Sequence, residues 1–147
     1  SQGDAEFLPF KDKCFDFVYC AHVLEHVENP VRALLEIQRV GKRGYIEVPT
    51  KMSDTLFNFA RMNHFHKWHI SIIGKTLIFI EYTENDRRDT GNQELFYMAH
   101  SLFPNHFKSM FRRNKDLFTN MFIWDDSFVF YIFEKNGKLI STNDNIR

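Results

Sequence analysis

The hydrophobic pattern is most regular in the first fifty residues of the chain. Asp16–Cys20 is a short apolar run with β-branched and aromatic side chains, which predicts a buried strand. Apolar residues then recur at helical spacing between Asn29, a good N-cap followed by Pro30, and Gly41, which suits a helix end. Gly44–Pro49 predicts a second strand. Strand, helix and strand with short links predict a right-handed crossover between parallel strands.

Two hairpins are predicted in the rest of the chain. Apolar residues alternate on both sides of Gly74-Lys75, and glycine at the first position of a two-residue loop suits a type II′ turn. The runs Phe118–Trp124 and Phe128–Phe133 are apolar, and Asp125-Asp126 between them is a hairpin signal. The tail from Asn136 onward is polar and is expected to fray.

Helices are predicted around Asp54–Arg61 and, from the spacing of its apolar residues, over Leu95–Leu102. The charged stretch Glu84–Asn92 between them predicts a solvated loop. Basic residues then gather close together among phenylalanines and a methionine. This pattern favours an amphipathic helix over a nucleic-acid groove, which needs more charge and exposed aromatic residues. The basic residues are Lys108, Arg112, Arg113 and Lys115.

Composition limits the classes of function. The 147 residues suit one domain, and a formal net charge of zero gives no general attraction to nucleic acid or anionic membrane. No apolar stretch approaches the length of a membrane span either. From the charge and the missing span together, we expect neither nucleic acid nor membrane as a partner. Cys14 and Cys20 do not suggest a disulfide framework, which favours a cytoplasmic location. The 17 phenylalanines can fill a core, line a pocket or cover an exposed surface.

Several short motifs carry a family resemblance. Gly3–Phe10, His22–Val27 (His-Val-Leu-Glu-His-Val), Glu36–Val40 and Val48-Pro49, in this order and spacing, resemble the class I S-adenosylmethionine-dependent methyltransferases, type 11 subgroup. The resemblance implies an α/β fold: a partial Rossmann-like sheet of parallel strands with helices and a closing antiparallel hairpin. On this basis residues 1–50 form the second half of the cofactor-binding core and 51–94 an insertion. Residues 95–135 add a helix and the final hairpin, and 136–147 form the tail.

The resemblance also implies a function, methyl transfer from S-adenosylmethionine to a small-molecule acceptor. The matching positions for cofactor contact are Asp4 and Ala5 on the adenine side and Cys20, Ala21 and His22 beside the methionine portion. An aspartate here also suits an ordinary turn, and a histidine at a strand end is often a packed residue. Catalytic residues are not assigned.

Histidines raise the question of a metal. His64, His66 and His69 lie close together, but no cysteine or carboxylate stands nearby at a recognisable metal spacing, so no metal is predicted. His66 and Trp68 are candidates for a wall of the acceptor pocket, and an exposed segment entering a strand is the plainer alternative. For Glu25-His26, a local structural hydrogen bond is favoured over catalysis.

The 147 residues contain no glycine-rich cofactor loop of the kind this family carries. We therefore expect a carboxyl-terminal part of a methyltransferase with weak or no cofactor binding alone. A glycine-rich loop encoded upstream of Ser1 would favour an enzyme. A homo-oligomer or a missing amino-terminal half is expected to cover an exposed sheet edge and apolar face. The alternative is a non-catalytic remnant that acts as an interaction domain.

Overall fold

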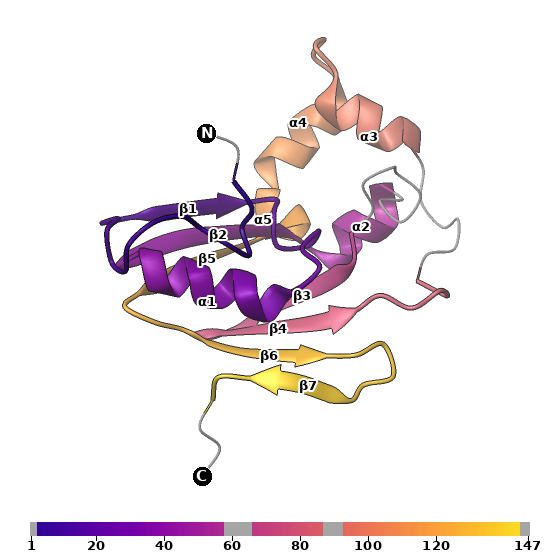
Figure 1. Ribbon diagram of the computed structural model, residues 1–147. Helices are drawn as coiled ribbons and strands as arrows, with labels where there is room; N and C mark the ends of the chain where they lie inside the picture. The colour runs from indigo at the N-terminus through magenta and orange to yellow at the C-terminus, as the bar shows by residue number, and fades with distance from the viewer. Residues whose placement is uncertain (1–2, 58–65, 87–92, 145–147) are drawn as a thin grey trace.

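The protein forms an α/β structure with two mixed sheets (Figure 1). The computed structural model describes residues 3–57, 66–86 and 93–144. The first sheet has the order β1-β2-β5, and the second has the order β3-β4-β6-β7. The strands are β1 (Val18–Ala21), β2 (Arg43–Pro49), β3 (Trp68–Ile73), β4 (Thr76–Glu81), β5 (Thr119–Asp125), β6 (Val129–Phe133) and β7 (Leu139–Thr142). The helices are α1 (Pro30–Val40), α2 (Lys51–Phe57), α3 (Gln93–His100), α4 (His106–Arg113) and α5 (Lys115–Phe118).

The predicted crossover unit β1-α1-β2 is confirmed. β1 and β2 pair in parallel, from Val18 opposite Gly44 to Ala21 opposite Glu47. The Asn29 side chain caps α1 by accepting from the backbone N–H of Arg32 at 3.1 Å. Because these signals are local in sequence, the two ends of α1 follow from the residues that flank it.

Helix α1 covers one face of the first sheet (Figure 1), and the main core lies between them. Leu34 and Ile37 of α1 are buried in the same cluster as Ile46 and Phe122. Gly44 allows a close backbone approach here, because a Cβ at this position would lie 2.3 Å from the Val18 carbonyl oxygen. The cluster continues into the second sheet through Trp68, Ile70, Leu77, Phe79, Phe130 and Ile132.

The predicted hairpin around Gly74-Lys75 is also confirmed. β3 and β4 pair in antiparallel fashion, with Ile73 opposite Thr76 across the two-residue loop. Gly74 has a φ of +60°, in the region that favours glycine and that a type II′ turn requires at this position.

The predicted final hairpin is wrong, because β5 and β6 belong to different sheets. β5 pairs with the whole of β2 in antiparallel fashion, and β6 pairs in parallel with β4. At the junction, Asp126 has a φ of +62° and donates its backbone N–H to the Lys42 carbonyl at 2.9 Å. The acidic pair thus carries the chain from one sheet to the other, where each strand finds a distant partner.

The polar tail does not fray where the structure describes it. β7 pairs with β6 in antiparallel fashion and so completes the second sheet. The Asn143 side chain donates to the Phe128 carbonyl and accepts from the Phe130 N–H, which fixes the end of β7 beside β6. The prediction of a frayed tail is therefore wrong for this strand.

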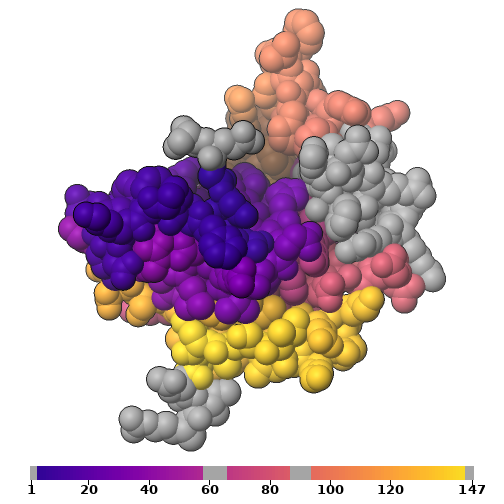
Figure 2. Space-filling model, in the orientation of Figure 1, coloured from indigo at the N-terminus to yellow at the C-terminus, as the bar shows by residue number. Residues whose placement is uncertain are grey.

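The helices after residue 50 agree in part with the prediction. α2 begins at Lys51, and the predicted extension to Arg61 lies outside the described residues, as does most of the predicted loop before α3. α3 ends at His100, so the prediction that Leu102 is helical is wrong, and this side chain is 94% exposed. α4 is the predicted amphipathic helix. Together α3 and α4 project away from the sheets (Figures 1 and 2).

Candidate functional site

A cavity of about 510 Å³ lies where β1 and β2 end and the helices after residue 50 begin. Polar side chains line it at the strand ends and the segment after β1. The helices α2 to α5 contribute four phenylalanines, together with the polar residues Ser53, His100, Arg112 and Lys115. Open α/β sheets bind ligands at the carboxyl ends of their parallel strands. The described lining residues are His22, Glu25, His26, Glu47, Pro49, Ser53, Phe57, His66, Phe96, His100, Phe111, Arg112, Lys115, Phe118 and Thr119.

His22 stands at the point where β1 ends. Its backbone has a φ of +53°, an uncommon conformation for a residue with a side chain, and its N–H donates to the Glu47 carbonyl at 2.9 Å. The ring is half exposed, with Nε2 3.2 Å from Glu47 Oε1 and Nδ1 3.5 Å from Glu25 Oε1. The pKa of His22 is raised, chiefly by the interaction with Glu25; burial opposes the rise and the Glu47 charge adds to it.

Glu47 is a buried carboxylate at the polar wall. It accepts from Lys115 Nζ at 2.8 Å and from the Tyr45 hydroxyl, and it also contacts the His22 ring. Burial acts to raise the pKa of Glu47, but the donors Lys115 and Tyr45 outweigh it, so the pKa is lowered. The carboxylate therefore joins the strand end to α5 as a charged group.

A second buried network holds His66. Asp54 of α2 accepts from His66 Nδ1 at 2.6 Å through one carboxylate oxygen and from the Tyr82 hydroxyl at 2.6 Å through the other. All three residues are buried. The network ties α2 to the end of β4 and fixes the orientation of the His66 ring at the cavity.

Glu25 is the unusual polar group of the cavity. Its side chain is 0% exposed, and within the described parts of the chain neither carboxylate oxygen has a hydrogen-bond partner. Among the described residues, the local hydrogen bond expected for Glu25-His26 is therefore absent at the Glu25 carboxylate, whereas the His26 N–H donates to the Val23 carbonyl at 3.1 Å. Glu25, His26 and His66 each bring a possible ligand atom to within 4.8 Å of the others. The ring centroids of His26 and His66 lie 4.7 Å apart.

The predicted cofactor residues lie on the first sheet and the turn before it. Asp4 is exposed, and its Oδ1 accepts from the Glu6 N–H at 2.9 Å, as in an ordinary turn. Glu6 in turn accepts from the Asn29 N–H at 2.8 Å, which holds the turn at the beginning of α1. The half-buried Ala5 packs against the core. Neither Asp4 nor Ala5 lines the cavity as described.

The remaining predicted residues separate into two environments. Cys20 is buried in β1 and Ala21 ends the strand beside His22. His66 lines the cavity, whereas Trp68 does not: its ring is buried in the core and its indole N–H donates to the Val27 carbonyl at 2.8 Å. Trp68 is therefore a core residue and not part of the cavity wall.

His69 lies outside this cluster of Glu25, His26 and His66. His69 packs beside Tyr82 in β3, with its ring 6.1 Å from the tyrosine ring. Burial is the main cause that lowers the pKa of His69. His64 lies outside the described residues.

Sequence reasoning missed Glu47, Asp54 and Lys115 as parts of the site. Glu47 carries a signal, since it is a charged residue in an otherwise apolar strand close to the strand end. Asp54 and Lys115 carry none, because each meets its partner, 12 and 68 residues away in sequence, only through tertiary packing.

In a comparison with known protein families, residues 1–46 match the family described as methyltransferase domain. A demethylmenaquinone methyltransferase of Geobacillus stearothermophilus is 35% identical over 103 residues, which are 65% of this chain and 44% of that protein. Residues 1–46 are therefore similar to the methyltransferase domain, and a longer part of the chain is similar to this one methyltransferase. An uncharacterised Schizosaccharomyces pombe methyltransferase is 48% identical over 42 residues, 29% of this chain and 15% of that protein.

These methyltransferase relatives are considerably longer than the aligned segment, and the chain spans less than half of the length of each. Among solved structures, one chain matches with a TM-score of 0.43 and 14% identity, over 85% of this chain and 60% of that one. It comes from the complex between the Haloferax volcanii Trm112 methyltransferase activator and a methyltransferase. Among the described residues, no helix has the length and apolar character to cross a membrane.

Proposed function

We propose that this protein is a methyltransferase, and that it transfers a methyl group from S-adenosylmethionine to a small, largely apolar acceptor held in the cavity. One observation carries the proposal: the segment that matches the methyltransferase family includes His22 and Glu25, and the same two residues line the cavity. The first sheet is then the later part of a Rossmann-like methyltransferase sheet, with its ligand edge where β1 and β2 end.

The cofactor is proposed to lie against Asp4, Ala5, Cys20, Ala21 and His22. The turn fits an adenine ring in its chemistry, since the exposed Asp4 carboxylate can accept from an exocyclic amine and a Cβ on Gly3 would meet no atom within 4 Å. Ala21 is small and allows a close approach at the end of β1. When bound, the cofactor supplies the activated methyl group.

The acceptor is proposed to pack against the aromatic wall. Phe57, Phe96, Phe111 and Phe118 line this side, and a volume of about 510 Å³ suits a small molecule. The name of the Geobacillus stearothermophilus relative points to a quinone-type acceptor, whose ring would suit these side chains. Alignment of donor and acceptor contributes most to such a reaction, since holding reactants in near-attack geometry lowers the barrier by about 7–11 kcal/mol.

The experiment measures transfer of a labelled methyl group to a panel of naphthoquinols, using the gene product with any sequence that precedes the chain. Phe111→Ala removes part of the aromatic wall and is expected to lower kcat/KM for an apolar acceptor about tenfold, the value of 1–2 kcal/mol of lost contact. Phe103→Ala is the control, because Phe103 is exposed and does not line the cavity. No transfer to any acceptor, or equal effects of both variants, would contradict the proposal.

A second candidate function is a non-catalytic interaction domain. It is favoured by an apolar face of the first sheet, opposite α1, where Tyr19, Met121 and Ile123 are exposed. This candidate requires a stable protein that binds no S-adenosylmethionine even when any sequence that precedes the chain is included. For the 147 residues alone we expect weak or no cofactor binding under either function, so calorimetry on the gene product with any sequence that precedes the chain separates the two.

A further inference from the structure

We propose that Glu25, His26 and His66 bind a divalent transition metal ion, with zinc the ion that their donor atoms fit best. The three residues gather at the polar end of the cavity, with one ligand atom of each within 4.8 Å of the others. The site goes beyond methyl transfer, because the binding of a metal needs neither the cofactor nor the acceptor.

The buried Glu25 side chain is the main reason for placing a cation here. Both carboxylate oxygens are buried and lack a hydrogen-bond partner in the described structure. Burying a carboxylate without compensation is costly, so such a group is ordinarily paired or bound to a metal. The backbone also fixes this residue, because the Glu25 carbonyl accepts from the N–H groups of Lys67 and Trp68 at 2.7 and 3.2 Å. The carboxylate is thus held at the cavity wall.

The distances suit an ion after small side-chain rotations. In a tetrahedral zinc site with bonds of about 2.0–2.1 Å, two donor atoms lie roughly 3.4 Å apart. His26 Nε2 lies 4.0 Å from Glu25 Oε1, and no two of the possible ligand atoms are more than 4.8 Å apart. Contraction of the donor separations by at most about 1.4 Å, from rotations of the His26 and Glu25 side chains, brings the donors to bonding distance.

Asp54 orients His66 as a supporting carboxylate orients a metal-bound histidine. His66 Nδ1 donates to Asp54 Oδ1 at 2.6 Å, and this tautomer places the lone pair of the ring on Nε2. A carboxylate that accepts from the second ring nitrogen is the usual partner of a metal-bound histidine. Two imidazoles and one carboxylate favour zinc or a similar transition ion over magnesium or calcium. Three protein ligands also leave a coordination position directed at the cavity.

His22 offers the competing explanation for the buried carboxylate. Its Nδ1 lies 3.5 Å from Glu25 Oε1, and a protonated ring would supply the opposite charge without any metal. The two accounts differ in a measurable way, since only the metal site predicts stoichiometric uptake that depends on His66.

The test uses tag-free protein that has been stripped with a chelator, dialysed and titrated with Zn²⁺ in a calorimeter. Co²⁺ is added in a parallel titration, because its visible absorption reports tetrahedral coordination. We expect one equivalent to bind and the thermal midpoint of unfolding to rise with Zn²⁺. Glu25→Gln keeps the size of the side chain. Loss of a supporting group typically weakens metal binding about 10- to 100-fold, and we expect at least this effect from Glu25→Gln and from His66→Ala, because each removes a ligand.

Asp54→Asn, which alters the supporting carboxylate, is expected to weaken Zn²⁺ binding by about 10- to 100-fold. His69→Ala is the matched control, since His69 lies outside the cluster, and it should bind as the unchanged protein does. Circular dichroism confirms that each variant is folded. Absence of saturable uptake by the unchanged protein, or uptake unaffected by Glu25→Gln and His66→Ala, would overturn the metal site. Either result would leave the proposed methyl transfer standing.

Discussion

Removing the hydroxyl of Tyr82 tests the buried network that supports the cavity. Tyr82 donates to Asp54 Oδ2 at 2.6 Å, and both residues are buried. Tyr82→Phe hardly changes the packed volume but leaves one carboxylate oxygen without its donor. Because an unsatisfied buried polar group costs about 1–3 kcal/mol, the free energy of unfolding should fall by that amount. Tyr97→Phe is the control: this ring is exposed, so its effect should stay within about 0.5 kcal/mol.

Asp54→Asn completes a double-mutant cycle on the same contact. The amide keeps the shape of the carboxylate, but its NH₂ group must face either Tyr82 or His66, which costs about 1–3 kcal/mol. Since both changes break the same hydrogen bond, the double variant should lose less than the sum of the two, with a coupling energy of about 0.5–3 kcal/mol. Urea denaturation followed by circular dichroism measures all four proteins. Effects that add to within about 0.5 kcal/mol would refute the network.

Three further predictions concern the first sheet and α1. Burial, with a smaller effect from Glu25, raises the pKa of the Cys20 thiol to about 12. Iodoacetamide at pH 8 should therefore alkylate the exposed Cys14 and spare the buried Cys20, and peptide mass spectrometry measures both. Gly44→Ala should destabilise the protein by about 1–3 kcal/mol in urea, because the new Cβ meets a β1 carbonyl oxygen. The hydrogen bond from Arg39 lowers the pKa of Glu36 from the ordinary value of 4.5. The ionised Glu36 carboxylate therefore contributes fully to stability above pH 4.5, and this contribution is lost as the pH falls below 4.5.

Each of these predictions has a control and a contrary result. Equal alkylation of both cysteines in the folded protein would show that the Cys20 thiol is not buried. Gly3→Ala is the control for the glycine, since a Cβ there meets nothing, and equal stability of both glycine variants would contradict the close approach. Glu36→Gln should lose stability less steeply below pH 4.5 than the unchanged protein does. Parallel acid-denaturation curves would exclude this carboxylate as a contributor.

The sequence predicts the elements whose signals are local. The N-cap of α1 at Asn29 and the glycine turn at Gly74 lie next to the structure that they specify, and both are found as expected. The junction at Asp125-Asp126 has the composition of a hairpin turn, but the partners of the flanking strands lie elsewhere. β5 pairs with a strand some seventy residues earlier, and no residue in the turn encodes that choice.

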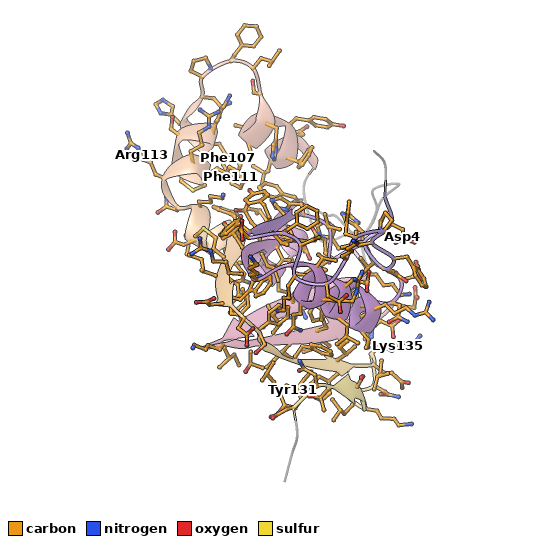
Figure 3. All side chains as sticks on the ribbon, turned by 60° about the vertical axis from the view of Figure 1, so that its left-hand side comes forward. Asp4, Phe107, Phe111, Arg113, Tyr131 and Lys135 are labelled. Carbon is orange, nitrogen blue, oxygen red and sulfur yellow. The ribbon has the colours of Figure 1, made fainter. Side chains whose placement is uncertain are left out.

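The candidate site divides in the same way. The motif around His22 points to the end of β1, because it is a contiguous segment with a family resemblance. The other side chains of the cavity come from separate elements. Asp54 meets His66 only after α2 is docked, and Phe96, Phe111 and Phe118 converge on Phe57 through tertiary packing. Figure 3 shows Phe107 and Phe111 on the inner side of α4, while Arg113 points outward.

The most direct test of the central claim is the binding position of the demethylated cofactor. Amide NMR spectra of the ¹⁵N-labelled gene product, with any sequence that precedes the chain, are recorded while S-adenosylhomocysteine is added to millimolar concentration. The account predicts progressive shifts of the amides of Asp4, Ala5 and Cys20–His22, at the turn and at the end of β1. Shifts confined to the second sheet, or none at the highest concentration, would contradict a methyltransferase ligand edge at this end of the first sheet.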